Sequence, residues 1–167
     1  MIATLSQCLS FVHYFVKLIT LMNWGLNGYQ RIDRLKQLQR KMGREWGASQ
    51  PNDDQAQEIR NCYSKLRATV ERAVQDEALA GTVQRFSDYI QPKKLNKVIK
   101  GFTAEVNVRI QNLYQRCNDV VDAHDASANG MKEVPTPDEF LDDIDELKSV
   151  IDEIRSNQSV TIQGSFP

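Results

Sequence analysis

The sequence predicts an all-α protein, an antiparallel bundle of four to six helices, several of them long. Apolar residues recur at spacings of three and four along most of the 167-residue chain, which is the periodicity of one helix face. The eight glycines and five prolines lie mostly between these periodic runs. No series of alternating Val, Ile, Thr and Tyr residues separated by hairpin turns is present. A chain of this length can bury a core within one domain.

Residues 1–25 predict a helix that is apolar on nearly every side. The run from Leu9 to Met22 has no early positive charge and no small-residue cleavage site, so it does not fit a secretory signal. It is also shorter than a membrane span and contains His13 and Lys17. We expect a protein partner or a second copy to cover it, with an interfacial membrane helix as the alternative. The interface residues expected there are Phe11, Phe15, Leu18, Ile19 and Met22.

Residues 28–156 are expected to form the bundle. A helix over residues 29–46 carries an apolar stripe and a basic opposite face, and a short loop joins it to an antiparallel neighbour. Asn52 or Asp53 is expected to cap that neighbour, which continues to Ile90 with a kink or a close helix crossing at Gly81. Pro92 must end the helix because proline lacks the amide hydrogen.

Three further elements follow. A short basic helix is expected over residues 93–100, and a longer helix over residues 104–124 is capped by Thr103. The last helix, residues 137–155, begins with a capping box of Thr136 and Glu139, and residues 157–167 are a flexible tail. The expected core stripe is Ile32, Leu35, Ile59, Leu66, Val70, Ile110, Leu113, Ile144, Leu147 and Ile151.

Charge is divided along the chain, although the net charge is −1. Residues 30–111 carry sixteen Lys and Arg against ten Asp and Glu, whereas residues 112–167 carry four against twelve. We therefore expect the acidic last helix to cover basic faces of the same chain; the alternative is that the basic middle binds nucleic acid or an acidic partner. The residues for such binding are Arg31, Arg34, Arg40, Lys41, Arg44, Lys93, Lys94, Lys97 and Lys100.

No complete motif for chemistry is present, so we expect a non-enzymatic protein without catalytic residues, cofactor or metal. The phosphate-binding pattern Gly-x-x-x-x-Gly-Lys-Ser/Thr is absent. The cysteines Cys8, Cys62 and Cys117 are far apart, without His at ligand spacing, which favours a reduced, cytoplasmic setting. Arg116 and His124 are eight positions apart, close to the Arg-x(4 to 6)-His spacing of HEPN-type ribonucleases but different from it. A ribonuclease is therefore only a third alternative.

Several segments, taken in order, resemble a known family. They are Leu66 to Glu77, Val83 to Phe86, Ala123 to Ala128, and Val134 to Phe140 with the Asp-Ile-Asp-Glu-Leu helix that follows. This order is similar to the C-terminal helical region of large bacterial AAA-family ATPases of the RecF/SMC-like kind, several of which are associated with defence against foreign DNA. The similarity covers residues 28–156 and lacks the nucleotide-binding lobes, so no catalytic residue carries over. It implies a module that docks on an ATPase or similar partner, or a remnant of such an enzyme.

Overall fold

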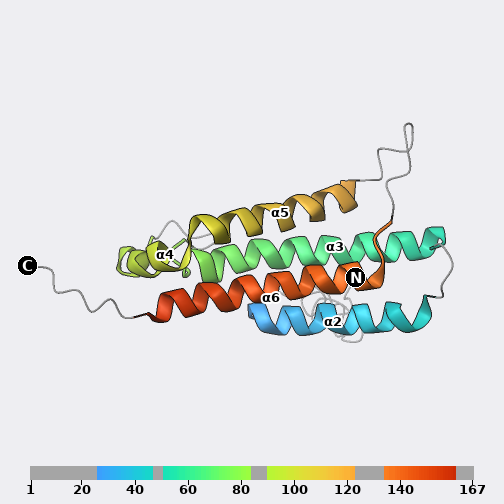
Figure 1. Ribbon diagram of the computed structural model, residues 1–167, viewed down its shortest axis with the longest axis horizontal. Coiled ribbons are helices and arrows are strands. Elements are labelled where there is room, and N and C mark those ends of the chain that lie inside the picture. Colours follow the sequence, from blue (N-terminus) through green and yellow to red (C-terminus); the bar gives the residue numbers. More distant parts are fainter. Residues whose placement is uncertain (1–25, 47–50, 84–89, 123–133, 161–167) are drawn as a thin grey trace, which may run out of the picture.

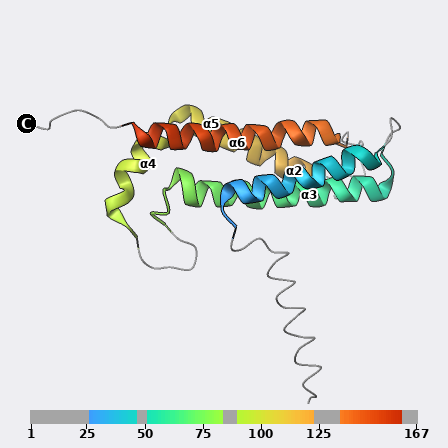
Figure 2. The same ribbon diagram turned by 90° about the horizontal axis from the view of Figure 1, so that it is seen from below.

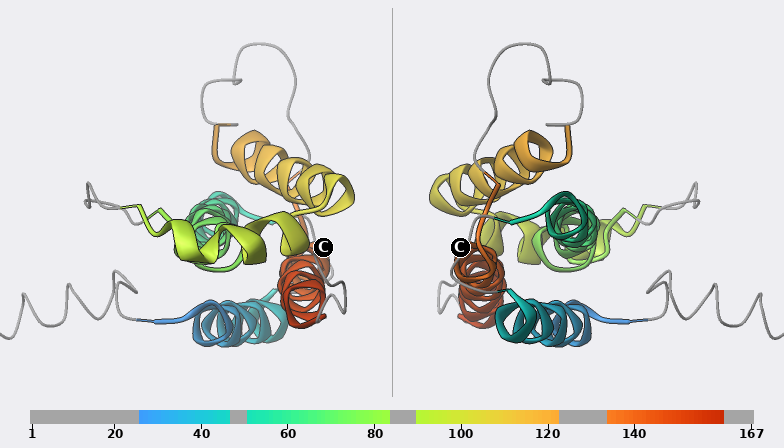
Figure 3. Two further views of the ribbon diagram at one scale, coloured as in Figure 1. Left: turned by 90° about the vertical axis from the view of Figure 1, so that its left-hand side faces the viewer. Right: turned by 90° about the vertical axis from the view of Figure 1, so that its right-hand side faces the viewer.

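The computed structural model describes residues 26–46, 51–83, 90–122 and 134–160, and its regular structure there is helical throughout. Four long helices, α2 (Gly28–Glu45), α3 (Asp53–Ala73), α5 (Ala104–Val121) and α6 (Pro137–Ser159), alternate in direction in chain order (Figure 1). Viewed along the bundle axis, α5 and α2 lie farthest apart, with α3 and α6 between them (Figure 3). The expected all-α class with four to six helices is confirmed, and the described ranges contain no strand.

Each long helix begins at a side chain that accepts a hydrogen bond from an amide of the first turn. Capping boxes are formed by Asn27 with Gln30, Asn52 with Gln55, and Thr136 with Glu139. The Thr103 hydroxyl accepts from the Val106 amide at 3.2 Å. These bonds satisfy amides that have no partner within the helix. The expected caps at Thr103 and Thr136 are confirmed, and Asn52 caps α3.

The core lies where the apolar stripes of the four long helices meet. All ten residues of the expected core stripe are buried there. The largest fully buried side chains are Tyr63 and Phe140, whose ring centroids lie 5.1 Å apart. The expected antiparallel pair of α2 and α3 is present, but α3 packs most extensively on α5, and α2 on α6. The bundle is therefore built from two principal pairs.

The third predicted helix ends earlier than expected. At Val74 the chain passes from α3 into a π-helical turn, η1 (Val74–Ala78), and then adopts left-handed backbone at Ala80 (φ 48°) and Gly81 (φ 61°). Glycine takes this conformation without the steric cost that other residues incur, so Gly81 ends the helix and does not merely kink it. The predicted extension to Ile90 is wrong, and Ile90 is 58% exposed.

A short segment closes one end of the bundle. A 3₁₀ turn, η2 (Pro92–Lys94), leads into α4 (Leu95–Gly101), which lies across that end (Figures 2 and 3). Gly101 packs closely on Gln158, and a Cβ atom at Gly101 would lie 2.7 Å from that side chain. This contact needs α6 to continue, and α6 does so to Ser159. Residues 157–159, expected in the tail, are therefore helical.

Some expectations fall on residues outside the described ranges. They include the N-terminal helix over residues 1–25 with its interface residues Phe11, Phe15, Leu18, Ile19 and Met22, the tail over residues 161–167, and His124. Within the described part of the chain, no helix is both long and apolar enough to cross a membrane.

Candidate interaction surface at the α4 end

The acidic last helix covers basic residues of α5, as the charge division predicts. Arg109 donates to both carboxylate oxygens of Glu146, through Nε at 2.7 Å and Nη2 at 3.0 Å, and its Nη1 lies 2.5 Å from Glu153. A bidentate arginine–carboxylate pair is among the stronger ionic contacts in proteins. The hydrogen bond from Arg109 lowers the pKa of Glu146. The expected attraction between the basic middle and the acidic end is thus confirmed within the chain.

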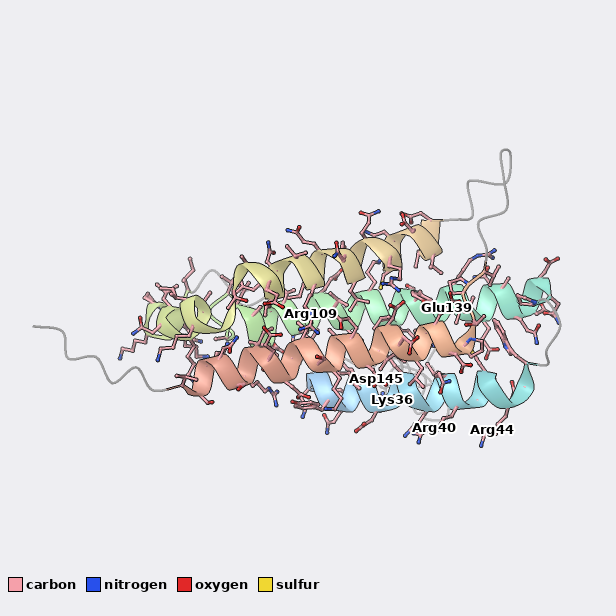
Figure 4. The ribbon with its side chains drawn as sticks, in the orientation of Figure 1. Lys36, Arg40, Arg44, Arg109, Glu139 and Asp145 are labelled. Carbon is pink, nitrogen blue, oxygen red and sulfur yellow. The ribbon has the colours of Figure 1, made fainter. Side chains whose placement is uncertain are left out.

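The lysines of α2 also have acidic partners. Lys36 Nζ lies 2.5 Å from Asp145 Oδ1 on α6, and Figure 4 shows the two side chains pointing toward each other. Lys41 Nζ lies 3.0 Å from Glu58 on α3 and 3.4 Å from Glu45 on α2. The hydrogen bond to Glu58 is the main cause of the raised pKa of Lys41. Lys41, expected to contact nucleic acid, therefore already has two carboxylate neighbours.

The arginines of α2 differ in exposure. Arg31 is only 7% exposed, its Nε donates to the Leu26 carbonyl at 3.1 Å, and burial lowers its pKa. Arg34 is half-buried, whereas Arg40 and Arg44 are exposed and point away from the bundle (Figure 4). The expectation that Arg31 lies at a nucleic-acid surface is wrong, because its position continues the buried stripe. Arg40 and Arg44 are the best-exposed arginines of the α2 set.

A buried polar cluster joins α3, α5 and α6. The Tyr63 hydroxyl donates to Asp143 Oδ2 at 2.8 Å, and Arg116 Nη1 lies 2.9 Å from Asp143 Oδ1. Asp143 is 2% exposed, and burial raises the pKa of its carboxyl, although Tyr63 and Arg116 both lower it. Arg116 thus contacts α6, whereas His124, its partner in the hypothetical ribonuclease pair, lies outside the described residues.

The described thiols are not poised for reaction. Cys62 and Cys117 are buried, and burial raises the pKa of Cys62 to about 11 and that of Cys117 to about 12. Both are therefore protonated at neutral pH, whereas the thiolate is the nucleophile and the metal ligand. Among the residues that the structure describes, no group of three or more His, Cys, Asp or Glu side chains is placed to hold a metal ion.

The end of the bundle that α4 closes combines exposed apolar and basic side chains. We define the α4 end as Ile90, the segment from Pro92 to Gly101, and Val160. Its exposed apolar residues are Ile99 (76% exposed), Val160 (60%), Ile90 (58%) and Leu95 (46%). Four exposed large aliphatic side chains at one end of the bundle make this end the candidate interaction surface of the described residues.

The lysines of the α4 end have few counter-charges. Lys93 and Lys97 are exposed and Lys94 is half-buried, and across the described ranges none of the three lies within 4 Å of a carboxylate. Lys100 Nζ instead donates to the Val160 carbonyl at 3.0 Å. The nearby carboxylates of η1 already have other partners, because Asp76 pairs with Arg72 and Glu77 pairs with Arg155.

The sequence predicts the lysines of the α4 end but not the exposure of its apolar residues. Leu95 and Ile99 are four positions apart and so lie on one face of a helix. This spacing is the sequence feature that indicates an apolar face there. Whether the core or solvent meets that face depends on how α4 lies across the bundle. Comparisons with family models, with curated proteins and with solved structures found no match to this chain.

Proposed function

We propose that this chain is a non-enzymatic helical interaction module that docks on a protein through the α4 end. The observation that supports this most is the exposure of Ile90, Leu95, Ile99 and Val160 beside Lys93 and Lys97. Fully burying a Leu or Ile side chain contributes about 1.5–3 kcal/mol, so a partner that covers Leu95 and Ile99 gains substantial free energy. The lysines around them favour an acidic partner surface.

The family resemblance suggests a more specific form of this proposal, an accessory role beside an ATPase or a nucleic-acid-processing complex in the cytoplasm. The N-terminal segment, with Phe11, Phe15, Leu18, Ile19 and Met22, stays a second predicted contact. The two contacts are compatible, because one chain with two separate contact surfaces can join two neighbours in an assembly.

Site-specific photo-crosslinking in cells tests the docking role, because it captures a neighbouring protein of any identity. The photoreactive residue p-benzoylphenylalanine replaces Ile99 in the full chain, and Val108 in a matched control. Val108 is a suitable control because it is also exposed (53%) but lies on α5. We expect a discrete protein adduct from position 99 and none from position 108. Adducts absent from position 99, or equal from both positions, would refute docking through the α4 end.

Nucleic-acid binding is the second candidate, because Lys93, Lys94 and Lys97 have no described carboxylate partner. Phosphate contacts make affinity fall steeply with salt, and each lost contact reduces that salt dependence. Replacing Lys93 and Lys97 by Ala would then weaken DNA binding, whereas Leu95→Gln with Ile99→Gln would leave it intact. Loss of the protein adducts from position 99 when Leu95 alone is replaced by Gln, without any DNA binding to weaken, would favour the protein-docking role instead.

A further inference from the structure

We infer that the α4 end binds the opposite end of a second copy of this chain, so that molecules associate head to tail. This inference rests on the proposed docking role of the α4 end and names its partner. It is carried by three features of the described residues: the charge of the opposite end, the apolar side chains there, and the distance between the two ends.

The opposite end of the bundle carries the complementary charge. Helices α3 and α6 begin there and α5 ends there (Figure 1). We define the acidic end by its exposed aspartates, which are Asp53, Asp54, Asp122, Asp138 and Asp142. Within the described ranges, none of them lies within 4 Å of a basic side chain. Arg40 and Arg44 are the exposed arginines of this part of α2, so the acidic end keeps an excess of negative charge.

The acidic end also offers apolar surface. Four half-buried hydrophobic residues pack against the core at this end, from the C-terminus of α2, the last turn of α5 and the segment before α6. They are Trp46, Val120, Val121 and Val134. These side chains are less exposed than Leu95 and Ile99 of the α4 end, so charge is the principal complementarity between the two ends.

The two ends cannot neutralise each other within one molecule. Helix α6 has 23 residues and runs from the acidic end to the α4 end, so the ends lie about 35 Å apart at 1.5 Å per residue. Screening at physiological ionic strength acts over about 8 Å. The attraction between the acidic end and the α4 end therefore acts only between two different molecules. Because the two surfaces differ, the contact is heterologous and generates an open chain or a ring.

Charge reversal at each end tests the inference in the full-length protein. We expect wild-type protein to self-associate in sedimentation equilibrium, less so as salt is raised. Lys93→Glu with Lys97→Glu reverses the α4 end, and Asp122→Lys with Asp142→Lys reverses the acidic end; each pair should weaken association at least tenfold. Among single reversals, Lys97→Glu should weaken association, whereas Lys65→Glu, at an exposed lysine in the middle of α3, should leave association unchanged.

Mixing the two reversed proteins gives the sharpest result. Each protein alone has two ends of like charge, whereas every contact between the two proteins joins ends of opposite charge, so an equimolar mixture should recover the association that each protein alone has lost. Monomeric wild-type protein at high concentration, association unaffected by either reversal, or a mixture that stays monomeric would overturn head-to-tail binding. The docking role would survive any of these results if position 99 still crosslinks to a different protein, so the two proposals fail separately.

Discussion

Helices α2 and α4 are both rich in basic residues, but their surroundings differ. On α2, Lys36 lies 2.5 Å from Asp145 and Lys41 lies 3.0 Å from Glu58, so these cations help to hold neighbouring helices together. On the α4 segment, Lys93 and Lys97 have no carboxylate within 4 Å in the described part of the chain. Similar runs of sequence thus give an internal set of contacts in one place and an exposed surface in the other.

The composition of α6 explains this difference. Its carboxylates occupy the part of the helix that packs between α2 and α5, and the last of them is Glu153. Residues 155–160, which lie nearest α4, contain no Asp or Glu. The short basic helix therefore meets a stretch of α6 that cannot neutralise it. The role of a charged run is set by which part of a partner helix reaches it.

The largest effect on stability should come from the innermost ionic contact. Asp143→Ala removes the acceptor of the buried Tyr63 hydroxyl and should lower the free energy of unfolding by about 1–3 kcal/mol. Urea denaturation measures it. Asp142→Ala is the control, because Asp142 is exposed, and should change stability by less than about 0.5 kcal/mol. Equal effects at the two positions would contradict the structural role of Asp143.

A smaller effect is expected at the partly exposed pair between α5 and α6. Arg109→Gln removes the bidentate bond to Glu146 and should lower the free energy of unfolding by about 0.5–1 kcal/mol. Arg44→Gln, at an exposed arginine, should have no measurable effect. If both substitutions were neutral, the ionic contact between α5 and α6 would make no measurable contribution to stability.

This second effect should also depend on pH. Arg109 lowers the pKa of Glu146 below its ordinary value of 4.5, so the unfolded chain takes up that proton first as pH falls. The stabilisation is therefore complete above the ordinary pKa and is lost as pH falls through the lower, folded pKa. Wild-type and Arg109→Gln proteins should differ in stability at neutral pH and converge in acid, as followed by urea denaturation across pH. A constant difference would show that Glu146 is not responsible.

The smallest effect should come from the α4 end. Lys93→Ala with Lys97→Ala removes no ionic contact of the described chain and should change the free energy of unfolding by less than about 0.5 kcal/mol. Lys36→Ala, which breaks the pair with Asp145, should cost up to about 1 kcal/mol. Thermal unfolding of the two variants side by side measures the contrast. A larger loss for the α4 variant would reverse the comparison.

Sequence periodicity predicted the core well because helix faces depend on local spacing. Every residue of the expected core stripe is buried, including Ile110 near the edge at 8% exposure. The extension of α3 was wrong for a local reason as well. Val83 and Ile90 continue the apolar spacing. The left-handed backbone at Ala80 and Gly81 nevertheless changes the direction of the chain before it reaches them, so they do not extend the helix. Periodicity alone carries no information about the backbone of Ala80.

The α4 end was only half predictable. Its lysines are evident in the sequence, and a basic surface there was expected. The exposure of Leu95 and Ile99 depends on how α4 lies across the end of the bundle, where Gly101 packs on Gln158, a residue far away in the chain. Burial of Arg31 was missed for a different reason: its position continues the apolar stripe, but its charge assigned it to the exposed basic face.

The buried Asp143 also determines how far α6 is inserted along its neighbours. The apolar stripe of α6 repeats every seven residues. If α6 slid by two turns along its neighbours, Ile151 would lie where Ile144 lies, and nearly every core contact would still be apolar. Asp143 breaks that degeneracy, because its heptad equivalent is Val150. In that slipped alignment Val150 would lie where Asp143 lies, so the buried Tyr63 hydroxyl would face a methyl group and lose its acceptor. One acidic side chain thus specifies the register of an otherwise repetitive helix.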